Sequence, residues 1–315
     1  MSSSVMPPWP PVTLADFSWW TTHLDKASAM CMSGALLIMA FTILHNKIYG
    51  ETPDPKKVKR SGVSIGIMGA MPPEIAMLQK HVEEVKEYKV NDALSIFKGH
   101  LHGKTVVFAS AGVGTVFAAT TATAMVTMFN VDVVVFTGVA GGLLADQKVG
   151  DIVIGKDCVN YDMDVTAFVP FPGCRFSRGQ LPFINWLEYP ADPQLLKLAL
   201  AAPLPASFKG TVTQGRIATG SVFVTVPKKI EFVKETKAWG LGSCAAVEME
   251  CASVAQVCKS FERPFLGLRA LSDVMKGDAN DDFNAFTQFA ADNLWPIVSS
   301  IVEHYKKPIF GQASS

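Results

Sequence analysis

The sequence predicts an α/β protein, a three-layer α/β/α sandwich with a central mixed, largely parallel sheet. Short apolar runs that end in glycine turns alternate with helix-like blocks from residue 63 onward, which is typical of this class. The run 131–137 is almost continuously apolar, as expected of a strand buried on both faces. Two later runs, 245–250 and 269–273, end in acidic residues. This pattern places carboxylates at the sheet edge where open α/β folds bind ligands.

The first expected strand, 63–70, leads into a glycine turn, and Pro72-Pro73-Glu74 then opens a helix with proline in its first turn, where proline is tolerated. A second strand, 105–110, ends at the glycine turn 111–114 and is followed by a helix over 115–129. The remaining expected elements are the strand 131–137 with its glycine turn 138–142, strands at 152–154, 214–219, 245–247 and 264–270, and a closing helix over 283–305.

Composition disfavours several functional classes. The 315 residues carry 28 basic and 28 acidic side chains, so the net charge is zero and nucleic acid is not an expected partner. The six cysteines form no CxxC pair and no His/Cys ligand cluster, which favours core cysteines in a reduced compartment and no metal site. None of the glycine turns is a GxGxxG or GxxxxGK[ST] motif, so neither a dinucleotide nor a triphosphate is expected, and no cofactor is predicted.

Residues 1–61 form an N-terminal extension of different character. Residues 27–44 contain no charged side chain, just long enough for a short membrane-spanning helix, and the basic cluster Lys56, Lys57, Lys59 and Arg60 follows. By the positive-inside rule, an inserted span would leave the domain that follows it facing the cytoplasm. A cleaved targeting peptide and an extension that never inserts are the alternatives. The predicted boundaries are therefore 1–61 for the extension, 62–308 for the catalytic domain and 309–315 for a C-terminal tail.

Two acidic strand ends are the strongest functional signal. Glu248 and Glu250 close one apolar run, and Asp273 closes the other about twenty residues later. Two carboxylates in one crevice can divide the work, since one can accept a proton or hold hydroxyl groups while the other donates a proton. Helix capping by Glu250, which precedes a helix-like segment, is the alternative interpretation.

Seven motifs occur here in the order found in methylthioadenosine/S-adenosylhomocysteine nucleosidases, and the chain resembles that family of the nucleoside phosphorylase superfamily over residues 63–307. The motifs lie at residues 66–74, 110–114, 137–142, 149–153, 164–168, 247–250 and 269–274. The resemblance implies a nucleoside phosphorylase-like fold. It also implies hydrolysis of the N-glycosidic bond of 5′-methylthioadenosine and S-adenosylhomocysteine, with release of adenine and a 5-thioribose.

The resemblance also implies roles for individual residues. Asp273 would be the general acid that protonates purine N7, and a carboxyl group can do this near neutral pH only where its surroundings raise its pKa. Glu250 would hold the ribose hydroxyls, Glu74 would be the base for the attacking water, and Arg269 and Glu248 would support them. The other residues expected at the substrate are Met71, Ala111, Gly112, Phe223, Val224, Met249, Ser272 and Phe283. Phe168 would reach the 5′ pocket from a second subunit, which implies a homodimer.

A phosphate-using nucleoside phosphorylase of the purine or uridine type is the nearest alternative. Phosphorylases of this superfamily carry arginines in the first and second glycine turns, and arginine matches phosphate oxygens well. Here residues 71–74 and 111–115 contain no arginine or lysine, and Glu74 would repel phosphate. Ala111 stands where many of these nucleosidases have serine, and residues 169–192 exceed the family minimum in length. A non-catalytic nucleoside-binding or storage relative is the third alternative, and Glu74, Glu250 and Asp273 together argue against it.

Overall fold

The structure is a computed structural model that describes residues 62–170, 172–275 and 283–307, without the side chains of residues 283–286 and 288. The predicted membrane or targeting segment 27–44 and the tail 309–315 lie outside the described residues, so both stay predictions. Within the described ranges, no helix is long and apolar enough to cross a membrane.

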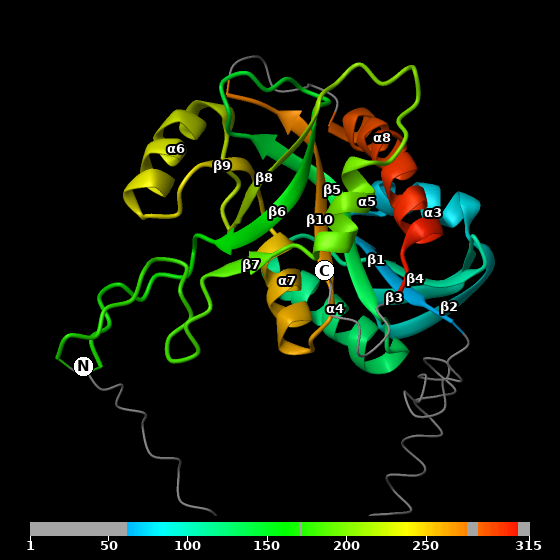
Figure 1. The fold of residues 1–315 in the computed structure, drawn as a ribbon, viewed down its shortest axis with the longest axis horizontal. Helices are drawn as coiled ribbons and strands as arrows, with labels where there is room; N and C mark the ends of the chain where they lie inside the picture. Colours follow the sequence, from blue (N-terminus) through cyan, green and yellow to red (C-terminus); the bar gives the residue numbers. More distant parts are fainter. Residues whose placement is uncertain (1–61, 171, 276–282, 308–315) are drawn as a thin grey trace, which may run out of the picture. The chain divides into compact units, whose positions relative to one another are not determined.

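Ten strands pair in one mixed sheet (Figure 1). They are β1 (Ser64–Gly69), β2 (Glu83–Asn91), β3 (Leu94–Leu101), β4 (Lys104–Ser110), β5 (Val133–Gly142), β6 (Ile152–Asn160), β7 (Glu188–Pro190), β8 (Val212–Thr219), β9 (Cys244–Glu248) and β10 (Phe265–Asp273). The helices are the 3-10 turns η2 (Pro72–Ile75) and η3 (Val226–Lys228), with α3 (Ala76–His81), α4 (Thr115–Phe129), α5 (Pro193–Leu200), α6 (Lys229–Ala238), α7 (Cys251–Ser260) and α8 (Phe283–His304).

The pairing of the strands explains why several chain segments converge. Strands β4, β1, β5 and β10 are parallel neighbours, and β6, β8 and β9 form a second parallel set. Antiparallel pairings of β10 with β6 and of β5 with β9 join the two sets. As a result, five strands form a closed ring of pairings in the order β5, β10, β6, β8 and β9. The end of β9 therefore lies beside the end of β5.

Helices cover both faces of the sheet, as expected for three layers (Figure 1). The buried side chains of β5 alternate between two cores, because successive residues of a strand point to opposite faces. Val134 and Phe136 pack with α4 and α7, whereas Val133 and Val135 pack with α5 and α8. The mixed sheet between two helical layers confirms the predicted fold class.

Three parts of the prediction were incomplete. The glycine run expected as a turn after 131–137 is the second half of β5, which begins at Val133 and continues to Gly142. The hairpin of β2 and β3 was not predicted. β2 is mostly exposed and rich in charged side chains, so it lacks the apolar pattern by which strands are recognised in a sequence. Strand β7 and helices α5 and α6 were also missed.

Candidate functional site

A cavity lies where β1, β5, β9 and β10 end. Nine of the residues predicted from the sequence line it: Met71, Glu74, Phe223, Val224, Glu248, Met249, Glu250, Ser272 and Asp273. The others that line it are Ala70, Val113, Val139, Ala140, Gly141, Val222 and Val247. The topology therefore brings three predicted carboxylates, Glu74, Glu250 and Asp273, to one cavity from different elements.

Glu74 is buried in the turn η2, directly after β1. Its Oε2 accepts hydrogen bonds from the backbone N–H groups of Ala70 at 2.6 Å and Met71 at 2.8 Å, and its Oε1 accepts from Val139 N at 3.0 Å. Burial raises the pKa of Glu74, and these donors and the nearby charge of Arg269 oppose that rise. The carboxylate is thus fixed in position while its proton affinity is increased, which suits a general base.

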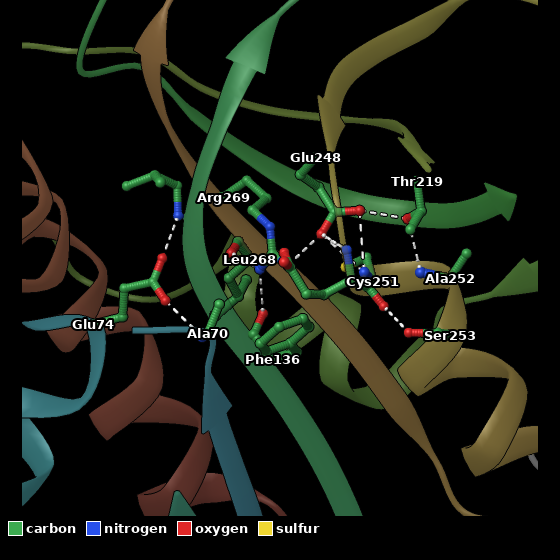
Figure 2. A network of polar contacts seen from close by, with 12 residues as sticks. Ala70, Glu74, Phe136, Thr219, Glu248, Cys251, Ala252, Ser253, Leu268 and Arg269 are labelled. Atoms are coloured by element: carbon green, nitrogen blue, oxygen red, sulfur yellow. Dashed lines mark hydrogen bonds and ion pairs between the residues drawn. The ribbon is translucent and has the colours of Figure 1, made fainter. Parts of the chain in front are cut away.

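Glu248, which lines the cavity, forms a buried ion pair with Arg269 (Figure 2). Arg269 Nη2 donates to Glu248 Oε2 at 2.7 Å, and its Nη1 donates to the carbonyl oxygens of Phe136 and Leu268. The guanidinium lies over the Phe136 ring, and the ion pair and nearby acids raise the pKa of Arg269 despite burial. Arg269 does not line the cavity. Its described contacts are with protein groups.

The other bonds of Glu248 order the start of α7. Thr219 Oγ1 donates to Glu248 Oε1, and the backbone N–H groups of Glu250 and Cys251 donate to the same carboxylate at 2.8–3.0 Å. Figure 2 shows the carboxylate between Thr219, Arg269 and the Cys251 amide. Glu248 therefore fixes the backbone that presents Met249 and Glu250 to the cavity.

Glu250 points its own carboxylate at the second glycine turn, where Oε1 accepts from Gly114 N at 2.7 Å. No hydrogen bond from its side chain caps α7, although Glu250 occupies the position that precedes this helix. Burial and the neighbouring Glu248 charge raise the pKa of Glu250 to about 7. The capping interpretation is thus not supported by the geometry.

Asp273 is the last residue of β10, and both of its carboxylate oxygens have partners. Ser272 Oγ donates to Oδ1 at 2.8 Å, and Lys229 Nζ forms an ion pair with Oδ2. Lys229 is the first residue of α6, is fully buried, and also donates to the Asp273 carbonyl oxygen at 3.0 Å. Sequence reasoning missed Lys229, because it lies in a run of charged residues that is typical of an exposed helix.

Three other predicted site residues, Ala111, Gly112 and Phe168, do not line the cavity. The backbone N–H groups of Ala111 and Gly112 donate to the carbonyl oxygens of Gly69 and Ala70, so these residues hold the turn after β1. Phe168 lies apart from the cavity in an exposed aromatic cluster with Phe176 and Phe183. The side chain of Phe283 lies outside the described residues.

Other residues at the site were not predicted from the sequence. Val113, Ala140, Gly141 and Val222 line the cavity. Val113 lies within the predicted glycine turn 111–114, so its position there was the available signal. In the described part of the chain, no group of three His, Cys, Asp or Glu side chains could hold a metal ion.

Comparison with known proteins gives consistent matches. The family model of the phosphorylase superfamily matches residues 64–303. The 5′-methylthioadenosine/S-adenosylhomocysteine nucleosidase of Geobacillus sp. (strain WCH70) is 36% identical over 245 residues, which are 78% of this chain and 100% of that protein.

Solved structures agree with this relation. The nucleosidase of the same name from Neisseria meningitidis, in complex with methylthio-immucillin-A, is 35% identical with a TM-score of 0.67, covering 77% of this chain and 99% of that chain. A futalosine hydrolase mutant of Helicobacter pylori strain 26695 is 31% identical with a TM-score of 0.66, covering 77% of this chain and 100% of that chain.

Proposed function

The chain belongs to the methylthioadenosine/S-adenosylhomocysteine nucleosidase family of the phosphorylase superfamily, and from this premise we propose its substrates and its catalytic residues. It is an N-glycosyl hydrolase. Its proposed substrates are 5′-methylthioadenosine and S-adenosylhomocysteine, and its proposed products are adenine and a 5-thioribose.

The observation that carries this proposal is the gathering of Glu74, Glu250 and Asp273 around one cavity with apolar walls. Cleavage of an N-glycosidic bond develops positive charge on the ribose and negative charge on the leaving purine. Carboxylates close to the sugar stabilise the cation, and a proton donor beside the purine neutralises the anion. The apolar walls, which include Met71 and Met249, suit a 5′-thioalkyl group.

Each acid has a proposed role. Asp273 donates a proton to purine N7 as the bond to the sugar breaks. Glu250 accepts hydrogen bonds from the ribose hydroxyls, and its charge stabilises the cationic sugar. Glu74 orients the attacking water and takes its proton. Glu248 at the cavity wall and its ion-pair partner Arg269 support this arrangement.

The purine is proposed to be held by Phe223 and Val224, in the loop that leads from β8 to α6, through ring stacking and backbone hydrogen bonds. Phe223 is 66% exposed in the single chain and lines the cavity, so it is free to cover a bound base. The partner subunit's Phe168 is proposed to complete the 5′ side in a homodimer. In its own chain this side chain is also exposed and lies apart from the cavity.

Water is favoured over phosphate as the nucleophile by the charges around the cavity. In the part of the chain that the structure describes, no arginine or lysine lines it, whereas four acidic residues do. Two buried cations near the cavity are already engaged, since Arg269 pairs with Glu248 and Lys229 pairs with Asp273. A phosphate dianion would be repelled by Glu74 and Glu250. Among the described lining residues, no arginine offers the paired hydrogen bonds that would offset this repulsion.

The test is product analysis with purified protein. Methylthioadenosine, S-adenosylhomocysteine and futalosine are each incubated with and without phosphate, and the base and sugar products are identified by mass spectrometry. Adenine and a free 5-thioribose at a rate independent of phosphate are expected from the first two substrates. A ribose-1-phosphate product would assign the chain to the phosphorylases. Turnover of futalosine alone would replace the proposed substrates.

A further inference from the structure

A buried cation lies against the proposed general acid. The Lys229 side chain has no exposed surface, and its ammonium group contacts Asp273 at both the carboxylate oxygen Oδ2 and the backbone carbonyl oxygen. An isolated buried ammonium is strongly disfavoured, so a fully buried lysine is usually paired or neutral. Here the pairing partner is the residue that is proposed to protonate the purine.

The fold makes room for this contact at Gly141 in β5. A Cβ atom at this position would lie 2.7 Å from Lys229 Nζ, 3.0 Å from Lys229 Cε and 3.4 Å from Asp273 Oδ2. Any side chain there would therefore displace the lysine from the carboxylate. Three elements, β5, β10 and α6, thus cooperate to place one ammonium group beside one carboxylate at the cavity wall.

Lys229 also differs from the other lysines of its segment. Its neighbour Lys228 is exposed, and the acids on the same helix, Glu231 and Glu235, are exposed as well. The charged group that contacts Lys229 from the strands packed against it is Asp273. The other acids of the cavity come from η2, β9 and the start of α7, and none has a hydrogen bond or ion pair with Lys229 among the described contacts.

The ion pair between Lys229 and Asp273 determines where the transferable proton lies. In the ion pair the transferable proton is on Lys229, so Asp273 can protonate N7 only by passing on that proton. The pair as a whole still holds one transferable proton, on either the amine or the carboxyl group. Burial lowers the pKa of Lys229, and the hydrogen bond and charge of Asp273 oppose this, so the ammonium is a stronger acid than a solvated lysine.

We propose that Lys229 is a positioning residue that holds Asp273 in place and stores the proton that Asp273 delivers to the purine. This proposal rests on the proposed nucleosidase activity. As the bond between C1′ and N9 breaks, its electron pair goes to the purine and N7 takes a proton from Asp273. The Lys229 ammonium passes its own proton to Asp273 Oδ2 and becomes a neutral amine.

The protons balance over one turnover. The attacking water forms the new bond to C1′ and gives one proton to Glu74, which releases it to solvent. After adenine leaves, the partly exposed Asp273 side chain takes a proton from solvent and returns it to the amine of Lys229. No other co-reactant is needed.

The pH profile of kcat/KM tests this role, because it reports the ionisations of the free enzyme. A carboxyl group alone loses its proton near pH 4 in ordinary surroundings, whereas the pair keeps its proton until the amine is deprotonated. In the wild-type chain the basic limb should therefore lie above pH 7. A basic limb in the range of an ordinary carboxyl group would overturn the proposal without any variant.

Variants at Lys229 distinguish a role in storing the proton from an effect of the charge alone and from a structural role. Lys229→Met should move the basic limb at least one pH unit toward acid and lower kcat/KM at pH 8 by tenfold or more, with partial recovery below pH 6. Lys229→Arg keeps the charge but does not release a proton, so it should not rescue activity at pH 8. Lys228→Met is the matched control and should keep the wild-type profile.

Three results would overturn the proposal. One is a uniform loss of activity in Lys229→Met at every pH without a shift of the limb, which indicates a structural role. Another is wild-type activity in Lys229→Arg, which indicates that charge alone suffices. If the wild-type chain releases no adenine, the proposed function fails, and the role of Lys229 fails with it. Adenine release with an unshifted variant profile refutes the role of Lys229 alone.

Discussion

Replacing Gly138 by alanine is expected to displace the Glu74 carboxylate while leaving the fold in place. Gly138 lies in β5 opposite η2, and an added Cβ would lie 2.5 Å from Glu74 Oε1 and 3.0 Å from its Cδ. Ordinary van der Waals contact begins at 3.4 Å, so the oxygen must move from 2.5 Å to 3.4 Å, a shift of about 0.9 Å.

That shift acts on the three hydrogen bonds that fix Glu74. The bond from Val139 N to Oε1 is 3.0 Å long and is stretched first. A hydrogen bond to a charged group contributes about 1.5–3 kcal/mol, and an extra methyl group in a packed core costs about 1–3 kcal/mol. Because the hydrogen bond is stretched and not removed, only part of its contribution is lost, and we expect a total loss of roughly 2–3 kcal/mol in unfolding free energy. Misplacement of a catalytic group by about 1 Å lowers the rate by about 10²-fold.

The assay is steady-state adenine release, with Tm measured on the same preparations. A loss of about 2–3 kcal/mol corresponds to roughly 4–12 °C in Tm for a domain of this size. Gly155→Ala is the matched control, because its added Cβ would lie 2.8 Å from Ile217 Cδ1 in the core, away from the cavity. Gly155→Ala should lose stability but keep kcat within about twofold. A Gly138→Ala variant with wild-type kcat would refute the positional role of Glu74.

The remaining predictions concern the other acids and the N-terminal extension. Asp273→Asn should lower kcat by about 10²–10⁴-fold with the fold retained by circular dichroism, and near-wild-type adenine release would remove Asp273 from the mechanism. Glu250 has a pKa raised from 4.5 to about 7, so its stabilising contribution is present below pH 4.5 and is lost as pH rises through 7. Glu250→Gln should therefore gain in Tm relative to wild type over this range, and a constant difference between the two would contradict the shift. Deletion of residues 1–61 should leave a folded and active enzyme, and a folded but inactive truncation would place part of the site in the extension. Carbonate extraction of membranes tests the anchor at 27–44, and full-length protein found wholly in the soluble fraction would exclude it.

Much of the site was predictable because it follows the ends of apolar strands. β9 and β10 are short buried runs whose last residues emerge at a sheet edge, so Glu248, Glu250 and Asp273 could be assigned to one region from sequence order alone. Glu74, which follows a glycine turn and two prolines, was assigned to the site through the resemblance of residues 66–74 to a motif of the nucleosidase family. These signals are local, and a local pattern is visible in a single sequence.

The partners of these acids were not predictable in the same way. Lys229 reaches Asp273 across 44 positions of sequence, and Glu74 takes a hydrogen bond from Val139 across 65. Both contacts depend on a close approach to glycines in β5. These glycines lie in the stretch 138–142, which the sequence predicted to be a turn. The strand pairing that brings β9 to the end of β5 depends on non-local register, and no periodicity in the chain encodes it.

The balance of charge around the cavity indicates which interaction stabilises the transition state. Glu74 is held by three backbone donors, Glu248 by Arg269, and Asp273 by Lys229. Glu250 has one backbone donor, from Gly114, and its pKa, raised to about 7 by burial and by the neighbouring Glu248, shows that its charged form is incompletely compensated in the free enzyme. A ribose that becomes cationic beside Glu250 would supply the missing positive charge only as the bond breaks. An interaction that strengthens from ground state to transition state raises kcat, whereas one made equally in both does not. Incomplete compensation of Glu250 in the free enzyme is therefore consistent with a carboxylate poised for the transition state.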